Sequence, residues 1–168
     1  MKRRLLLLRH AKSDWDAAYG DDHERPLARR GRRAARLVGR FLRAVDRVPD
    51  LVITSSAVRA RSTVELATEA GDWGAALEVS DELYDSEPRR VLEVLWRRGG
   101  SASTVLLAGH EPVWSLLAGG LIGGACLRFP TAALASLRFD VDEWSDAKRG
   151  ELEWMITPKL LARLETGA

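Results

Sequence analysis

Short, continuous apolar runs recur along the chain and are separated by longer stretches with helical spacing. Runs of this kind are typical of strands that are buried on both faces of a sheet. Two segments near the C-terminal end instead alternate apolar and polar residues, which is typical of edge or half-exposed strands. The pattern predicts strands over residues 5–8, 50–54, 104–108, 134–139 and 151–156, with a brief strand over 78–80.

Four segments between these strands carry apolar residues at helical intervals. In the first, Ala34, Leu37 and Phe41 recur at steps of three and four, so they form one face of an amphipathic helix. Gly71 is expected to terminate the second helix, and Pro88 opens the third at a favourable N-terminal position. The predicted helices cover residues 28–45, 58–70, 88–98 and 112–121.

The alternation of strands and helices predicts an α/β fold. We expect a three-layer sandwich in which a largely parallel sheet carries helices on both faces. The direction of the last two strands stays open. The length and the 46% of hydrophobic residues fit one compact core, so a single domain over residues 1–168 is expected. The polar stretch 13–26 is the best candidate for a mobile loop near a site.

Charge and cysteine content indicate the environment of the protein. The net charge is only +2, and the single cysteine, Cys126, has no partner in the chain. Cys126 lies in an apolar stretch, which favours a buried structural thiol in a reducing compartment. The N-terminal apolar run ends at Arg9 and is too short for a signal sequence or a membrane span. We therefore expect a cytoplasmic protein that does not enter a membrane.

One face of the first predicted helix is rich in arginine. These side chains recur at steps of three and four and form a stripe: Arg29, Arg33, Arg36, Arg40 and Arg43. A solvated helix face is the simpler interpretation. A docking surface for an acidic protein or a nucleic acid stays open, because aligned arginines attract anions. Nothing else in the sequence points to nucleic acid.

Basic residues and histidines follow three of the predicted buried strands. Arg9 and His10 come after the first, Arg59 shortly after the second, and His110 after the fourth. Ligands of such sheets bind beyond the C-terminal ends of the strands, where the following loops converge. A neutral imidazole can accept a phosphoryl group, and arginine binds phosphate oxygens in a bidentate manner. The sequence therefore predicts a phosphoryl-transfer site at this edge.

Ordered motifs along nearly the whole chain resemble those of the histidine phosphatase superfamily, which has a phosphoglycerate mutase-like fold. They are most similar to its small branch of SixA-like phosphohistidine phosphatases. The matching segments are residues 6–13, 25–27 with Gly31, 50–60 with Thr63, 83–84, 109–112, 130–131 and 158–159.

The resemblance implies a phosphatase that uses a phosphohistidine intermediate without a metal or another cofactor. His10 would be the nucleophile, while Arg9, Arg59 and His110 would bind the phosphoryl group. The sequence also contains no closely spaced metal-ligand cluster and no P-loop. The expected substrate is phosphohistidine on a protein. A phosphomonoesterase for a small metabolite and a phosphate-binding module without turnover are the alternatives.

Several further residues are weaker candidates. Lys12 and Ser13 follow the nucleophile and could donate to phosphate, and Glu82 lies near where larger relatives carry an acidic proton donor. Glu111 stands where the family usually has asparagine; it is expected to point away from the pocket or to pair with an arginine. The lesser proton-donor candidates are Asp85 and Asp14, and Trp15 could line the rim of the site.

Overall fold

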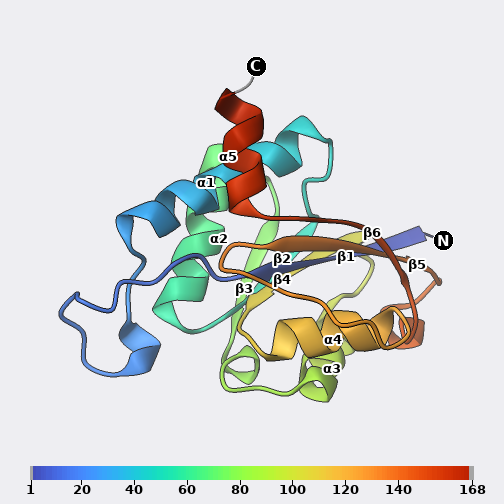
Figure 1. Ribbon diagram of the computed structural model, residues 1–168. Helices are drawn as coiled ribbons and strands as arrows, with labels where there is room; N and C mark the ends of the chain where they lie inside the picture. The colour runs from blue at the N-terminus through green and yellow to red at the C-terminus, as the bar shows by residue number, and fades with distance from the viewer. Residues whose placement is uncertain (1, 167–168) are drawn as a thin grey trace.

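The computed structural model describes residues 2–166, which form one mixed sheet between two layers of helices (Figure 1). The strand order is β3-β2-β4-β1-β5-β6. The strands are β1 (Lys2–Arg9), β2 (Leu51–Ser55), β3 (Ala76–Ser80), β4 (Thr104–Gly109), β5 (Leu134–Asp140) and β6 (Glu151–Ile156). This arrangement confirms the expected three-layer α/β fold.

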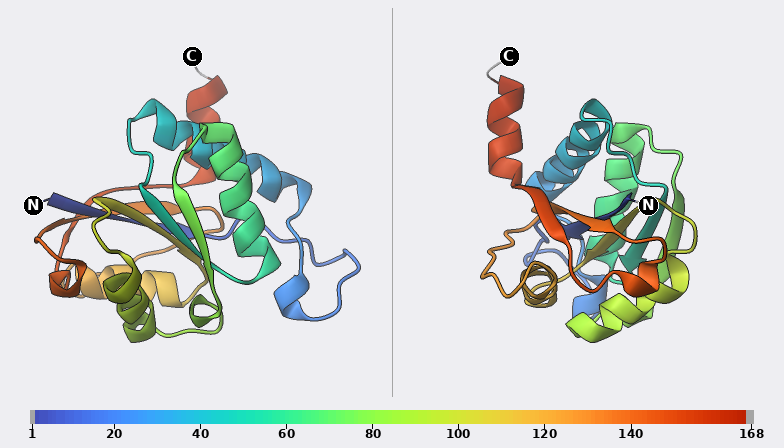
Figure 2. Two further views of the ribbon diagram at one scale, coloured as in Figure 1. Left: turned by 180° about the vertical axis from the view of Figure 1, so that it is seen from behind. Right: turned by 90° about the vertical axis from the view of Figure 1, so that its right-hand side faces the viewer.

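Helices cover both faces of the sheet, as the two further views show (Figure 2). On one face lie α1 (Arg29–Ala44), α2 (Val58–Gly71) and α5 (Pro158–Thr166), and on the other lie α3 (Pro88–Arg98) and α4 (Val113–Leu121). Three short 3-10 helices, η1 (Asp22–Glu24), η2 (Asp81–Leu83) and η3 (Trp144–Asp146), lie in the connections. None of the helices described is long and apolar enough to cross a lipid bilayer.

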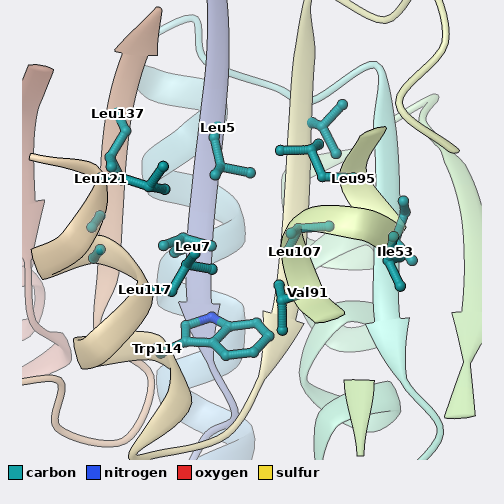
Figure 3. Close-up of a cluster of buried hydrophobic side chains, with 14 of the residues drawn as sticks. Leu5, Leu7, Ile53, Val91, Leu95, Leu107, Trp114, Leu117, Leu121 and Leu137 are labelled. Carbon is teal, nitrogen blue, oxygen red and sulfur yellow. The ribbon is translucent and has the colours of Figure 1, made fainter. Parts of the chain in front are cut away.

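The continuous leucine run of β1 supplies both cores. Leu5 and Leu7 point toward α3 and α4, where they join a cluster that contains Trp114 (Figure 3). Leu6 and Leu8 point to the opposite face and pack in the cluster that contains Leu42 of α1. All four leucines are fully buried, because successive strand residues face opposite sides and this strand is central.

The direction of the strands changes at β1. This strand runs parallel to β4, with Arg9 opposite Gly109, and antiparallel to β5. The parallel group β3-β2-β4-β1 therefore ends its strands at one edge of the sheet. Because β5 runs the other way, the segment that leads into β5 reaches the same edge. The C-terminal pair β5-β6 is antiparallel, which settles the direction that the sequence left open.

Three local expectations differ from the structure. Cys126 is exposed, so the predicted buried thiol is wrong: it lies in the irregular segment after α4, outside both cores. The residue that leaves α2 in the left-handed conformation is Asp72, with φ of 50°, while Gly71 still belongs to the helix. The helix α5 was not predicted, because Leu160 and Leu164 are exposed and only Leu161 of its leucines is buried.

Candidate active site

The ends of β1, β2 and β4 bring the predicted site residues together. His10 follows β1, Arg59 lies in the first turn of α2 after β2, and His110 follows β4. Because β1 and β4 pair up to Arg9 and Gly109, the next residue on each strand is a histidine. The two imidazole rings lie 5.1 Å apart between centroids and are tilted by 53°. One tetrahedral anion can therefore contact both rings.

His10 is held with one ring nitrogen available. Its Nδ1 lies 2.8 Å from the carbonyl oxygen of Ala11, and since a carbonyl only accepts, Nδ1 carries the proton and donates. The neutral ring then has its lone pair on Nε2. Burial lowers the pKa of His10 to about 4, and the charges of Arg59 and Arg9 act in the same direction, against the hydrogen bond to Ala11. His10 is therefore neutral, as a nucleophile must be.

His110 faces the same space from β4. Its Nε2 lies 2.8 Å from the hydroxyl oxygen of Ser55, the last residue of β2, while its Nδ1 is buried without a partner. Burial lowers the pKa of His110 to about 3, with His10 and Arg59 acting in the same direction and Asp22 opposing them. Tyr84 packs edge-on against the ring at 5.6 Å. His110 is a fixed neutral ring with one unused polar atom.

The two arginines also leave donors unused. Arg9 donates from Nη1 to the carbonyl oxygen of Phe129 at 2.7 Å, and its buried Nε has no partner. Arg59 donates from Nη1 and Nη2 to Asp22, and its Nε is likewise unpartnered. Buried polar atoms are nearly always hydrogen-bonded in folded proteins, so unpaired donors at one site mark where a ligand's acceptors belong. Phosphoryl oxygens fit this demand.

Asp22 belongs to the site and was missed by the sequence analysis. Its backbone oxygen accepts from Arg59 at 2.6 Å, and its carboxylate accepts from Arg59 at 3.0 Å and from Arg25 at 2.8 Å. Partial burial raises the pKa of Asp22, but Arg59 and Arg25 outweigh it and lower the pKa overall. The only signal was its position three residues before the motif that begins at Arg25.

A hydrogen-bonded network connects the loop after β1 to Arg25 and Arg59. Ser13 is buried, and its hydroxyl oxygen accepts a hydrogen bond from Arg25 at 2.5 Å. In this structure the hydroxyl therefore supports Arg25. The backbone oxygen of Lys12 accepts from the N–H of Ala28 at 2.9 Å, which ties the loop to the start of α1. Gly31 is required there, because a Cβ would lie 2.1 Å from the same Lys12 oxygen.

Trp15 lies at the outer edge of this network. Its ring is 62% exposed and stacks against the guanidinium of Arg25, 3.5 Å from the ring centroid. Trp15 is not among the residues that line the hollow beside His110. It therefore contacts the site through Arg25.

The structure does not bring Glu82 to the site. Its carboxylate contacts three arginines of α3, Arg97 at 2.7 Å, Arg98 at 3.5 Å and Arg90 at 3.8 Å. The hydrogen bond from Arg97 and the charges of all three lower the pKa of Glu82. The hollow beside His110 is lined by its neighbours but not by Glu82. The carboxylate of Glu82 is therefore engaged by the arginines of α3 and not by the residues that line this hollow.

Glu111 and the lesser acidic candidates take different positions. The carboxylate of Glu111 accepts from the backbone N–H of Ser115 at 3.0 Å, so it caps the first turn of α4 and is compensated by the helix N-terminus. Asp14 accepts from the N–H of Asp16 at 3.1 Å within the loop. Asp85 does line the hollow beside His110.

The site opens into two adjoining hollows. One, of about 380 Å³, is lined by Asp22, Arg59, Tyr84 and His110 among others. The second, of about 470 Å³, contains Arg9 and Lys12, and the two hollows share Glu111 and Pro112. Among the described residues, no group of three or more histidine, cysteine or acidic side chains could hold a metal ion.

Comparisons with known proteins agree with this geometry. Residues 5–87 match the model of the Histidine phosphatase superfamily (branch 1). An uncharacterized protein of Mycobacterium tuberculosis (strain ATCC 25618 / H37Rv) is 40% identical over 156 residues, which cover 85% of this chain and 93% of the relative. The relationship therefore extends over most of both chains.

Two solved structures share the fold. The SixA structure from Nakamurella multipartitia superposes with a TM-score of 0.83 at 28% identity, covering 94% of this chain and 97% of that one. The protein histidine phosphatase SixA complexed with tungstate gives a TM-score of 0.81 at 26% identity, covering 94% and 99%. The chain belongs to the histidine phosphatase superfamily, in its SixA-like branch, and is a phosphatase.

Proposed function

We propose that the protein removes the phosphoryl group from phosphohistidine on another protein, through a phosphorylated His10 and without a metal. The observation that carries this proposal is the His10–His110 pair: a buried neutral ring whose Nε2 is free, 5.1 Å from a second ring and beside unpaired arginine donors. The similarity to a protein histidine phosphatase complexed with tungstate supports it, since tungstate is a tetrahedral oxyanion.

The first step transfers the phosphoryl group to the enzyme. The lone pair on Nε2 of His10 attacks phosphorus, an Nε2–P bond forms, and the P–N bond to the substrate imidazole breaks. Arg9, Arg59 and His110 bind the equatorial oxygens, where positive donors stabilise the spreading negative charge. The departing imidazole takes its proton from solvent. Positioning and electrostatics supply the catalysis in this step.

The second step returns the enzyme to its starting state. A water oxygen attacks phosphorus, the Nε2–P bond breaks with its electron pair returning to Nε2, and the water gives a proton to solvent as inorganic phosphate leaves. His10 regains its lone pair, and its Nδ1–H stays bonded to the oxygen of Ala11, which fixes the ring for both steps. The same donors bind the phosphoryl oxygens throughout, so neither step requires the site to rearrange.

The preference for phosphohistidine follows from the leaving group. An alkoxide needs a proton from a positioned acid, whereas an imidazole departs readily and needs little help. Glu82 is engaged by arginines away from the site, and Asp22 is held ionised by Arg59 and Arg25. Neither of these two carboxyl groups is a suitable acid, so Asp85, which lines the hollow beside His110, is the candidate on which an ester substrate would depend. A substrate with an easy leaving group fits this arrangement best.

The test is capture of the phosphoenzyme. The purified protein is mixed with a histidine-containing protein phosphorylated by phosphoramidate and quenched within the first turnover. We expect an acid-labile, base-stable phosphoryl group on the chain, absent in His10→Asn. An aryl phosphate and a set of sugar phosphates are assayed in parallel. Fast hydrolysis of a phosphate ester with no action on phosphohistidine would establish a metabolite phosphomonoesterase. Phosphate binding without a phosphoenzyme or turnover would establish a binding module.

A further inference from the structure

A groove continues from the active site along the surface between α1 and α5. The hollow that contains Arg9 shares Lys12, Arg30 and Thr131 with a third hollow, of about 360 Å³, that reaches Lys159. Its walls come from the loop after β1, from α1, from the segment before β5 and from the start of α5. We call this surface the basic groove, after five cationic residues that line it: Lys12, Arg30, Arg33, Arg128 and Lys159.

The cations of the basic groove are not neutralised by the protein. Within residues 2–166, none of the five side chains forms an ion pair or a hydrogen bond. Other arginines of α1 behave differently: Arg40 pairs with Glu165 at 2.9 Å, and Arg43 lies 3.9 Å from Asp72. Of the described residues that line the groove, only Glu111 is acidic, and its carboxylate caps α4. A concave surface of one sign of charge concentrates the field and attracts anions.

The remaining lining indicates which kind of anion fits. Apolar surface beside the cations comes from Ala34, Leu37 and Pro158, and an apolar part of this kind can pack against the surface of a partner protein. Single-stranded nucleic acids bind by stacking their bases on aromatic side chains. The only aromatic residue lining the groove is Phe129, which is 1% exposed and offers no ring face. The groove therefore suits an acidic protein surface better than a nucleic acid.

We propose that the basic groove docks the acidic surface that surrounds the phosphohistidine of the partner protein. This inference rests on the proposed function and specifies, in addition, that the substrate protein is acidic around its phosphohistidine. A phosphoryl group held by Arg9 and His10 places the neighbouring surface of its carrier over the adjoining groove, since Arg9 lines the groove's first hollow. Complementary charge of this kind raises the rate of encounter and selects among partners.

The experiment compares short peptides that carry one histidine phosphorylated by phosphoramidate. One peptide has glutamates around the histidine, and the other has glutamines. The measured quantity is the ratio of kcat/KM for the two peptides, determined for the native protein and for two triple variants. The groove variant is Arg30→Glu, Arg33→Glu, Lys159→Glu. The matched control, Arg43→Glu, Arg89→Glu, Arg149→Glu, changes the net charge equally at exposed positions that line none of these hollows. Circular dichroism verifies that each variant is folded.

We expect the native protein and the control to prefer the acidic peptide by about tenfold at low salt, with the preference decreasing as salt increases. The groove variant should lose or reverse that preference. If both peptides are hydrolysed equally well by the native protein, the docking inference is overturned and the proposed function stands. If neither peptide is hydrolysed while an aryl phosphate is, both fail. If an RNA oligonucleotide inhibits more strongly than the unphosphorylated acidic peptide, and only in the native protein and the control, the groove binds nucleic acid and the inference is wrong.

Discussion

The hydroxyl oxygen of Thr63 accepts a hydrogen bond from the backbone N–H of Ala11 at 2.9 Å. The same hydroxyl donates to the carbonyl oxygen of Arg59 at 2.6 Å, one turn earlier in α2. One fully buried side chain thus connects Ala11, the residue after His10, to the turn of α2 that carries Arg59.

Replacing Thr63 by valine keeps the shape and removes the hydroxyl. The N–H of Ala11 is then buried without an acceptor, which should cost about 1–3 kcal/mol of unfolding free energy. We also expect kcat to fall, because the loop after β1 loses its contact to α2. Urea unfolding and steady-state kinetics check both effects. Thr63→Ser retains the hydroxyl and serves as the control; equal losses in Thr63→Ser would show that packing of the methyl group matters instead.

Replacing Asp22 by asparagine removes the negative charge beside the phosphoryl site and leaves one side-chain oxygen, which can accept from Arg59 or from Arg25 but not from both, because these arginines bond to different carboxylate oxygens. The anion then meets less repulsion. We expect the inhibition constant of inorganic phosphate to decrease about fivefold. This corresponds to the loss of roughly 1 kcal/mol of repulsion between two partly exposed negative charges. The inhibition constant is measured in the native protein, in Asp22→Asn and in Asp22→Ala, which lacks the acceptor. Weaker inhibition in Asp22→Asn would mean that the charge of Asp22 is needed to orient the arginines.

Replacing Glu82 by glutamine should leave turnover within about twofold of the native rate, since this carboxylate does not line the hollow beside His110. Stability should also change little, because ion pairs of exposed arginines contribute little. The rates are measured with an aryl phosphate and with phosphohistidine. Arg97→Gln, which removes the partner at 2.7 Å, is the matched control. A selective loss with the aryl phosphate in Glu82→Gln alone would restore Glu82 as a proton donor.

The lowered histidine pKa values predict a loss of stability in acid. Folded His10 has a pKa of about 4, chiefly from burial, against 6.5 for the ordinary group. Below pH 6.5 the unfolded chain binds a proton that the folded chain rejects, so stability decreases between pH 6.5 and about 4. The loss from His10 amounts to about 3 kcal/mol. His110, with a pKa of about 3, acts in the same direction.

Urea unfolding between pH 7 and pH 4.5 measures this slope. His10→Asn has no titrating ring at this position, so its unfolding free energy should depend less on pH over the same range. The kcat/KM of the native protein should show no inflection near pH 6.5 apart from that of the substrate's own phosphoryl group, because both rings stay neutral there. An identical slope of unfolding free energy against pH in His10→Asn would contradict the lowered values.

The sequence predicted the structure best in the central strands, where burial on both faces restricts which residues are possible. A strand buried on both faces must be apolar throughout, so its first polar residues mark its end; this located Arg9, His10 and His110. Parallel strands end at one edge, which placed those residues together. The amphipathic period of α1 was equally clear, because its buried residues share one face.

Contacts that depend on loops could not be predicted. Asp22 reaches Arg59 only because the loop after β1 folds back over α2, and nothing in the local pattern sets that path. The carbonyl of Phe129 contacts Arg9 only through the antiparallel entry into β5. Glu82 was a candidate because of its sequence proximity to Tyr84, but that proximity does not determine which way a side chain in a 3-10 helix points, and its carboxylate contacts arginines of α3. The exposure of Cys126 has the same origin, in an irregular segment.

The antiparallel pairing of β5 with β1 determines which connecting segment reaches the active site, and so where substrate range can change. It brings the connection between α4 and β5, residues 122–133, to the catalytic edge, although that connection belongs to neither the parallel sheet nor its helices. Gly123 and Gly124, both with positive φ, turn the chain at the start of the exposed part of this segment, residues 123–126. Changes in this exposed part would alter the surface near Arg9, whereas Phe129, Ala132 and Ala133 of the same segment are buried in the two cores. New substrate ranges are therefore most readily obtained, in evolution or by design, by grafting here.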